Sequence, residues 1–351
     1  MTSFSHLPLH LFPSSVAEIG QVRPIKSGMI NQTWALGDPP RYVGQIVHSS
    51  INVDAEAIIV ELGPILREVG IAVPRLVPTI DGSLSVPMPN ARRFRVLTWM
   101  PGTTRRRPQG KSQVGRMAAV AGRFHAALSL IAQHPLIKRS SLHDTDRYMV
   151  GVSHLTAESD LVPELRSLAD GILERWVAWK KQHHRTGAPL MVGHGDLRTE
   201  NFRVDSCTGE VLGLLDFDTI GTYELEEEFC DALRSWCGCR PRQDRTAGFS
   251  LARFELALDA YLAETADLFR HEMARLVVGL ERIYLELAAR YCLSAVHLTA
   301  FRIRARNMAE RLSRCAALTK FQLDQADHVH AQRAALERIM SRKLNDSNAF
   351  R

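Results

Sequence analysis

The sequence is poor in the features that mark secreted, membrane and metal-stabilised proteins. Its 351 residues contain six cysteines, and the nearest two, Cys237 and Cys239, form a C-x-C pair rather than the C-x-x-C spacing of zinc and redox sites. No stretch of 18 apolar residues occurs, and the apolar run at 117–132 is broken by Arg123 and His125, which argues against a membrane span. The start of the chain lacks a basic segment followed by an apolar one, so we expect reduced thiols and a cytoplasmic location.

Several common catalytic signatures are absent or incomplete. There is no G-x-S-x-G motif and no G-x-G-x-x-G motif, which removes the main support for an α/β-hydrolase or a Rossmann enzyme. The segment GKS at 110–112 has the form of the end of a phosphate-binding loop, but that loop requires glycine where the chain has Arg105. The pair HE at 271–272 is followed by Arg275 where a zinc protease requires a second histidine. Neither segment therefore indicates a function.

The charge balance is almost neutral for a chain of this length. Forty-four basic residues against 38 acidic ones give a net charge of +6, which favours a solvated surface over a nucleic-acid-binding face. The dense basic run at 105–107 has no interleaved aromatic residues on which bases could stack. We therefore expect neither nucleic acid nor a membrane as a partner, and no feature indicates an obligate protein partner.

The first part of the chain has the composition of a small sheet. Up to about residue 98, short β-rich runs at 41–48 and 94–99 alternate with turn signals, which is typical of antiparallel strands. One helix is expected among them. It begins near Asp54 and contains Pro64, which should kink it.

From about Gly102 onward the pattern is mostly helical. Helices are expected at 112–132, 161–183, 226–238, 250–270, 272–299 and 306–342. One interruption, at 189–218, has the pattern of strand, loop, strand, turn and strand. We therefore expect an α+β protein with a sheet-rich lobe at 1–98, a connection at 99–102, and a helical lobe at 103–351 that contains an embedded β-hairpin.

The segment at 189–218, which interrupts the helical pattern, contains the most informative motif. The segment HGDLRTEN at 194–201 has H-x-D-x-x-x-x-N spacing, which is that of the kinase catalytic loop, and DFD follows at 216–218. Asp196 lies in a predicted loop, where its carboxylate can accept a proton from a substrate hydroxyl or orient it. The hairpin would return Asp216 beside Asn201, so that a carboxylate and an amide oxygen converge on Mg²⁺ bound to nucleotide phosphates. The pattern predicts a phosphoryl-transfer site.

These motifs resemble those of the aminoglycoside phosphotransferase and choline kinase superfamily, which has a two-lobed protein-kinase-like fold. Further segments are similar to the N-acetylhexosamine 1-kinase type: GMINQTW at 28–34, YVGQI at 42–46, LHDT at 142–145, TGEVLGLLDFDTIG at 208–221, DALRS at 231–235 and ELAARYCLSAV at 286–296. The resemblance implies that Asp196 is the catalytic base or a hydroxyl-positioning carboxylate, and that Asn201 and Asp216 bind the metal. His194 would brace the loop, and Asp218 would be either a partner of the metal ligands or a turn residue.

The resemblance also implies a nucleotide site in the small lobe. Residues 27–33 are similar to the phosphate-covering loop of the family. Gly28 would allow close backbone approach, and Asn31 and Thr33 would offer donors to phosphate oxygens. The connection between the lobes would hold the adenine edge through backbone groups of Thr98 and Met100.

One position departs from the general kinase pattern. Gln45 occupies the strand position where a V-A-I-K motif supplies its lysine, although the sugar-kinase type also looks to carry Gln there. Lys26 or an arginine from elsewhere in the chain are the alternatives for the missing cation. Glu56 and Glu61 follow on the next helix, where one would be the lysine's ion-pair partner or both would be solvated surface.

The helical lobe is expected to present the acceptor hydroxyl to Asp196. The candidates that would bind the acceptor are His143, Asp144, Thr145, Asp231, Arg234 and Arg290. Of these we select Asp144 and Arg290. The resemblance favours Arg290, because a guanidinium offers several donors to sugar hydroxyls. An acidic loop at 226–228 would instead favour a cationic acceptor.

The sequence thus predicts an ATP-dependent, Mg²⁺-requiring kinase that acts on a hydroxyl group, with a sugar as the first candidate acceptor. An aminoglycoside, a choline-like alcohol or homoserine are alternative acceptors. A nucleotide-binding pseudokinase without activity is a further alternative, and Gln45 is the feature that motivates it.

Overall fold

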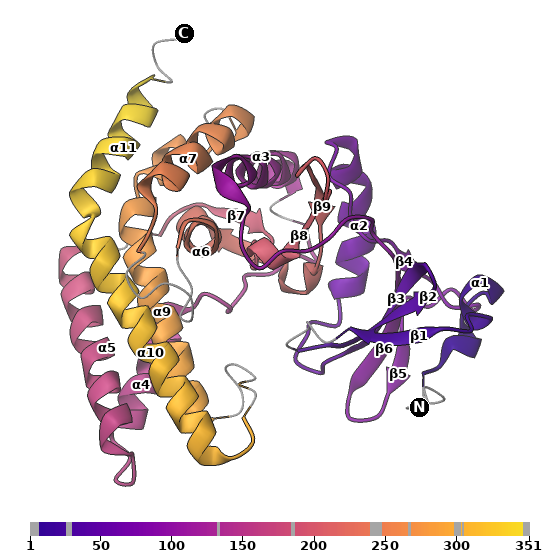
Figure 1. Ribbon diagram of the computed structural model, residues 1–351, viewed down its shortest axis with the longest axis horizontal. Helices are drawn as coiled ribbons and strands as arrows, with labels where there is room; N and C mark the ends of the chain where they lie inside the picture. Colours follow the sequence, from indigo (N-terminus) through magenta and orange to yellow (C-terminus); the bar gives the residue numbers. More distant parts are fainter. Residues whose placement is uncertain are drawn as a thin grey trace.

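The computed structural model describes residues 7–25, 30–131, 134–183, 187–238, 248–265, 268–297, 303 and 305–346 (Figure 1). Within these ranges a small antiparallel sheet adjoins a larger, mostly helical part, which confirms the α+β class expected from the composition. The short helix α1 (Ser14–Ala17) lies at the sheet, whereas α11 (Arg333–Asp346) lies at the opposite end of the molecule (Figure 1).

Among the described residues the sheet has six strands, each antiparallel to its neighbours. In spatial order they are β1 (Val22–Ile25), β2 (Gln32–Gly37), β3 (Pro40–Val47), β6 (Arg92–Thr98) and β4 (Leu76–Val77), and β5 (Val86–Met88) also pairs with β6. The strands β3 and β6 match the two runs predicted from the sequence.

Successive side chains along each strand point to opposite sides of the sheet, so its two faces differ in character. On one face Trp34, Ile46 and Phe94 form a small apolar core with Phe12 and Val16, which precede the first strand. The opposite face carries polar and charged side chains and is turned toward α2 (Ala55–Glu68), to which two of its arginines are bonded. The site described below is built on this second face.

The helix α2 shares its core with the larger part of the molecule. It runs as one helix through Pro64, and its side chains Ile58, Leu62 and Leu66 are buried in the same core as those of α3 (Gly110–Leu128). Figure 1 shows α2 between the sheet and α3. The division of the chain at 99–102 is therefore not a division of the core, and the proposed lobe boundaries stay a prediction.

The larger part is built of helices that bury apolar faces against one another. They are α3, α4 (Thr145–Thr156), α5 (Pro163–Gln182), α6 (Leu225–Cys237), α7 (Leu251–Thr265), α8 (Arg270–Met273), α9 (Leu276–Val296), α10 (Met308–Ala331) and α11. Two predicted helices are each divided, at 272–299 into α8 and α9 and at 306–342 into α10 and α11. The sequence interpretation missed α4, whose apolar periodicity is short.

Two small ribbons interrupt the helices. The predicted hairpin is present as β8 (Phe202–Val204) and β9 (Val211–Leu214). The strand β10 (Gly221–Glu224) was not predicted, and it pairs antiparallel with β7 (Leu190–Gly193). Because β7 and β10 are neighbours, and β8 and β9 are neighbours, the loop after β7 and the turn after β9 come to the same place.

None of the helices in the described ranges is long and apolar enough to cross a membrane. The five cysteines that lie within those ranges are free thiols.

Candidate active site

The loop after β7 is fixed through its backbone. The amides of His194 and Gly195 donate to the two carboxylate oxygens of Glu228 on α6, each at 2.8 Å. Glu228 is buried and also lies 3.4 Å from His125 Nε2. Gly195 has φ +76°, and a Cβ there would lie 2.2 Å from the Tyr223 hydroxyl, so a side chain does not fit. The helix α6 therefore holds this loop in one conformation.

His194 is part of the same frame. Its ring is fully buried, and Nε2 lies 2.9 Å from the Leu215 carbonyl, which belongs to the turn after β9. The hydroxyl of Thr219 donates to the His194 carbonyl at 2.7 Å. Burial lowers the pKa of His194, which favours the neutral ring. These are the contacts of a residue that braces the loop against the turn.

Asp196 lies at the exposed end of this loop and is ion-paired. The guanidinium of Arg198 contacts both of its carboxylate oxygens, with Nη2 at 2.8 Å from Oδ2. The side-chain amide of Asn201 donates to the same Oδ2 at 2.9 Å and to the Asp196 carbonyl at 2.7 Å. The side chain of Asp196 is 19% exposed and that of Arg198 is 29% exposed, so an arriving substrate can reach both.

The turn after β9 brings Asp216 to this loop. Leu215 donates its amide to the Asn201 carbonyl at 2.8 Å, so Asp216 follows directly after the residue bonded to Asn201. Asp216 has φ +65°, a left-handed conformation that carboxylate residues tolerate at a turn. Burial, together with the charges of Asp218 and Asp196, raises the pKa of Asp216 to about 7. Three carboxylates are therefore crowded at one point.

This crowding suits a divalent cation bound together with phosphate groups. The nitrogen of the Asn201 amide donates to Asp196, so its oxygen is the atom that can bind a cation, and the carboxylate of Asp216 adds a second hard oxygen. In the described ranges no three His, Cys, Asp or Glu side chains are arranged to hold a metal. Two protein oxygens completed by phosphate oxygens are nevertheless typical of Mg²⁺ in nucleotide-dependent enzymes.

The small sheet contributes a polar row that faces this point. Thr33, Gln45 and Arg95 are register partners across β2, β3 and β6, so their side chains share one face. Asn31, which precedes this row, donates to Asp218 at 2.7 Å and accepts from the His48 amide at 3.1 Å. Gly28, also predicted for the phosphate-covering loop, lies outside the described residues.

The missing lysine has a counterpart that sequence reasoning did not identify. Arg95 donates to Gln45 Oε1 at 2.8 and 3.0 Å, lies 3.4 Å from Glu56, and forms an ion pair with Asp218 at 2.7 Å. Glu56 is buried, whereas Glu61 is exposed on α2. The sequence carries no clear signal for Arg95, because two further arginines precede it in the same strand.

The segment after β6 is held by hydrogen bonds. Thr98 donates its amide to the Arg75 carbonyl at 2.8 Å and accepts from the Arg75 amide at 2.9 Å. Arg203 on β8 donates to the Met100 carbonyl at 2.6 Å and to the carbonyls of the next two residues. Its guanidinium also lies 5.5 Å from the centre of the Trp99 ring. Sequence reasoning missed Arg203, whose position in the hairpin carries no motif.

Arg290 belongs to a buried charged cluster in the helical part. The Nδ1 atom of His143 lies 2.9 Å from Glu286, and Arg290 lies 3.4 Å from the same carboxylate oxygen. The Arg290 guanidinium also lies 5.3 Å from the centre of the Tyr148 ring. Although burial opposes it, Glu286 raises the pKa of His143.

Asp231 lies between this cluster and the catalytic loop. Arg234 donates to it at 2.6 and 3.0 Å. Burial opposes ionisation of this carboxyl, but Arg234 and His143 lower its pKa. Asp231 in turn helps to raise the pKa of Arg198, which is paired with Asp196. The structure therefore joins the Arg290 cluster to Asp196 through a chain of charges.

Asp144 has a different contact. Its carboxylate accepts from the Arg147 amide at 3.1 Å and so caps the first turn of α4. It lies beside His143 in the chain, and its predicted contact with an acceptor stays a prediction.

The acidic segment at 226–228 is not a loop. These glutamates form the first turn of α6 and are buried. Glu226 pairs with Arg282 at 2.9 Å, Glu227 pairs with Arg139 at 2.6 Å, and Glu228 binds the catalytic loop as described. Since these charges are compensated inside the protein, the reason for favouring a cationic acceptor no longer holds.

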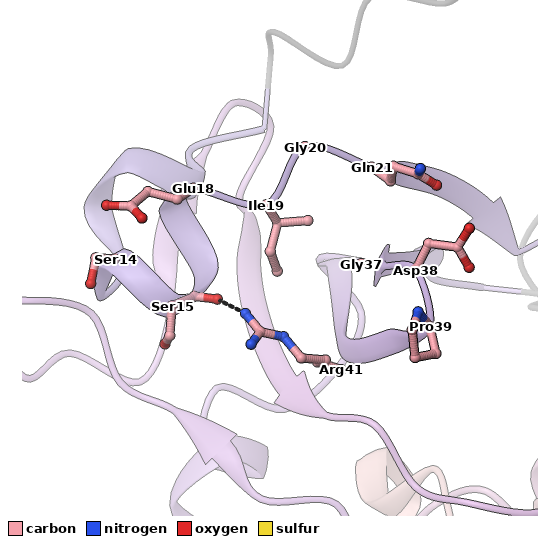
Figure 2. Close-up of a pocket in the computed structure, with 10 residues that line it drawn as sticks. All are labelled: Ser14, Ser15, Glu18, Ile19, Gly20, Gln21, Gly37, Asp38, Pro39 and Arg41. Carbon is pink, nitrogen blue, oxygen red and sulfur yellow. Dashed lines mark hydrogen bonds between the residues drawn. The ribbon is translucent and has the colours of Figure 1, made fainter.

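A surface pocket beside α1 lies away from these residues. It is lined by α1, by residues 18–21 and by the turn between β2 and β3. Figure 2 shows Arg41 in this pocket reaching the Ser15 carbonyl, at 2.8 Å. None of its lining residues is a predicted site residue, so we assign it no role.

Comparison with known proteins relates the whole arrangement to phosphotransferases. A model of the phosphotransferase enzyme family matches residues 21–266. No curated protein matches the chain.

Three solved structures with a similar fold are distant from this chain in sequence. An amicoumacin kinase in complex with AMP-PNP, Ca²⁺ and Ami has a TM-score of 0.59 at 18% identity, over 87% of this chain and 88% of that one. A microcompartment-associated aminopropanol kinase has a TM-score of 0.60 at 17% identity, over 89% and 93%. A choline kinase from Cryptosporidium parvum has a TM-score of 0.56 at 15% identity, over 89% and 90%. The likeness confirms the two-lobed kinase-like fold that the motifs predicted.

Proposed function

The chain belongs to the phosphotransferase enzyme family, and from this premise we propose that it is an ATP-dependent, Mg²⁺-requiring kinase that phosphorylates a hydroxyl group of a small molecule, a sugar first of all. The observation that carries the proposal is the convergence of Asp196, Asn201 and Asp216. Asn201 is bonded to Asp196 in the loop after β7, and its carbonyl accepts from Leu215, the residue before Asp216. The pairing of β10 with β7 keeps this loop beside the turn after β9.

In this proposal Asp196 is the catalytic residue. The acceptor hydroxyl attacks the γ-phosphorus, the bond to the bridging oxygen of the leaving ADP breaks, and Asp196 takes the hydroxyl proton. Its carboxylate is held by Asn201 and Arg198, so the acceptor hydroxyl has to replace part of the Arg198 contact. Mg²⁺, held by Asn201 and Asp216, would neutralise phosphate charge.

The nucleotide belongs between the sheet and the catalytic loop. Thr33 on β2 and Gln45 on β3 share one face of the sheet, and Asn31, just before β2, is bonded to Asp218. Thr98 ends β6 and Met100 follows it. Gly28, proposed for the same nucleotide site, lies outside the described residues. The amide of Thr98 is already bonded to Arg75, which leaves the Met100 amide as the candidate for the adenine edge. We keep 1–98 and 103–351 as the two lobes and 99–102 as their connection.

The acceptor side favours a neutral polyol. Arg290, His143 and Glu286 form a cluster in which one carboxylate is paired with two basic groups, so it offers both donors and acceptors without excess negative charge. This supports a sugar over a cationic amino alcohol. An aminoglycoside, a choline-like alcohol and homoserine stay the alternatives. The pseudokinase alternative is weakened, because Arg95 places a cation beside Gln45.

The test is ADP release by the purified protein over a panel of hexoses, hexosamines, amino alcohols and aminoglycosides with Mg²⁺ and ATP. Asp196→Asn is the blank. We expect its turnover to fall on the order of 10²- to 10⁴-fold, as for loss of a general base, while nucleotide binding measured by thermal shift is retained. Unchanged turnover in Asp196→Asn would remove Asp196 from the mechanism, and no ADP release with any acceptor would favour the pseudokinase.

A further inference from the structure

We propose that Arg95 takes over the work of the missing strand lysine as a positioning residue: it holds α2 and the turn at 216–218 against the sheet and thereby fixes the carboxylates that face the nucleotide. The inference rests on the proposed function, since it names a further residue of the same site. Its starting observation is that Gln45 is neutral and is the direct register partner of Arg95.

A single guanidinium contacts three separate elements here. Arg95 donates to Gln45 on β3 at 2.8 and 3.0 Å, lies 3.4 Å from Glu56 on α2, and pairs with Asp218 at 2.7 Å in the turn after β9. A guanidinium presents five donors in a planar fork, whereas an ammonium is a compact point charge on a flexible stem. Arginine is therefore suited to join the three elements at once.

Burial makes these contacts obligatory. The Arg95 side chain is 2% exposed, and the side chains of Glu56 and Asp218 are 4% and 3% exposed. Buried charges have to be paired, so removal of Arg95 would leave Asp218 without its ion-pair partner beside a second carboxylate, Asp216, and would leave Glu56 with Arg93 alone. The repulsion among them would be relieved by movement of the turn.

Such movement would reach the proposed metal ligand. Asp216 and Asp218 belong to one short turn, and Arg95 is bonded to Asp218, so a shift of Asp218 would also displace Asp216. The side chain of Arg95 is too buried to serve as an exposed phosphate contact, so it acts through the carboxylates that it holds. Gln45 then serves to orient the guanidinium rather than to bind phosphate directly.

The chain offers a matched control on the same strand. Arg93 lies two residues before Arg95, on the same face of β6, and its Nε atom donates to both oxygens of Glu56 at 2.8 and 2.9 Å. It also donates to the carbonyls of Ile51 and Asn52, in the segment that precedes α2. Replacing Arg93 thus loosens α2 without touching Asp218.

The experiment compares Arg95→Gln, Arg95→Lys, Arg93→Gln and the double variant Gln45→Lys/Arg95→Gln with the wild-type protein. Amide hydrogen exchange in the free protein reports on the turn at 215–220 and on α2, and steady-state kinetics separate kcat from KM for MgATP. The double variant moves the cation back to the strand position of the kinase pattern.

We expect Arg95→Gln to raise exchange in both segments and to lower kcat/KM on the order of 100-fold, the loss typical of a displaced catalytic group. Arg93→Gln should raise exchange in α2 alone and keep kcat within about twofold, because the turn is not displaced. Arg95→Lys and the double variant should each recover part of the lost kcat/KM.

Wild-type exchange at 215–220 in Arg95→Gln would overturn the inference, whether or not the protein turns over any acceptor. Equal values of kcat/KM in Arg95→Gln and Arg93→Gln would also overturn it. The same holds if neither Arg95→Lys nor the double variant recovers any of the lost kcat/KM. Failure of the wild-type protein to release ADP would count against the proposed function alone, since the exchange measurement does not depend on turnover. If Arg95→Gln does not fold, Arg95→Lys and the double variant supply the same comparison.

Discussion

Asn31, the residue just before β2, donates a hydrogen bond to the carboxylate of Asp218 at 2.7 Å across 187 positions of the sequence. The bond ties the beginning of the small sheet to the turn that carries Asp216. Because Asn31 belongs to the segment at 27–33 that is proposed as the phosphate-covering loop, the bond couples this residue of the loop to the position of the carboxylates.

Asn31→Asp should therefore weaken nucleotide binding. The new carboxylate can still accept from the His48 amide, but it replaces a donor facing Asp218 with a like charge. Hydrogen bonds to charged groups contribute roughly 1.5–3 kcal/mol, so we expect KM for MgATP to rise by about tenfold or more. Asn52→Asp is the matched control, because the Asn52 side chain accepts from the Asp54 amide, which an aspartate also does, and lies on the surface. Equal KM values in the two variants would show that the bond to Asp218 has no role in nucleotide binding.

Glu228→Gln should destabilise the protein and slow turnover together. One carboxylate oxygen would become an NH₂ group that faces the amide of His194 or Gly195, so two donors would meet in a buried place. We expect a loss of about 2–3 kcal/mol in the free energy of unfolding, measured by urea denaturation. Burial opposes ionisation of Glu228, but the hydrogen bonds from the His125 ring and the Gly195 amide lower its pKa, so its contribution is present above the ordinary glutamate pKa and is lost at lower pH.

The control for this change is Glu264→Gln, which removes a carboxylate from a partly exposed pair with Arg123. Exposed pairs contribute about 0–1 kcal/mol, so this variant should stay close to the wild type. A loss in Glu228→Gln no greater than that in Glu264→Gln would contradict the assigned role of Glu228.

The proximity of the loop after β7 to the turn after β9 was predictable from the sequence because its parts are local, while the catalytic and metal-binding roles of its residues stay predictions. Asp196 and Asn201 are five residues apart in one loop, and a short hairpin returns Asp216 to them. The motif spacing and the turn signals were therefore enough to predict that the three residues lie close together. The larger helices were predictable for the same reason, since each carries its own periodicity. Strand β10 was not predicted, because its four residues, directly after a turn, are too few to show an alternating apolar pattern.

The residues that hold the centre were not predictable. Arg95, Glu228 and Arg203 act across the fold, at separations that no spacing rule covers, and each is an ordinary charged residue in its local segment. The glutamates at 226–228 were misinterpreted for the same reason, because their arginine partners lie on other elements. Only the assembled structure shows that their charges are paired.

Arg203→Lys should loosen the segment between the sheet and the helical part. A lysine keeps the charge but cannot bond three successive carbonyls or stack on Trp99 as the guanidinium does. We expect a loss of about 1–2 kcal/mol in stability and a rise in KM for MgATP with little change in kcat. Arg116→Lys is the control, since Arg116 bonds one exposed carbonyl in the β8–β9 turn. The assignment fails if both variants have wild-type KM values.

His143 and Glu286 should give the protein a pH-dependent stability. Burial disfavours the charged ring, but Glu286 and Asp231 outweigh burial and Arg290, so the pKa of His143 lies above its ordinary value of 6.5. A group with a raised pKa in the folded state stabilises it fully below the unfolded pKa, and this contribution is lost as pH rises through the folded pKa. The stability difference between the wild-type protein and His143→Gln should therefore be largest below pH 6.5 and shrink at higher pH. Urea denaturation between about pH 6 and pH 9 measures it, with the exposed His154→Gln as control. A difference that is constant over this range would mean that His143 is held as a neutral ring and that Glu286 is balanced by Arg290 instead.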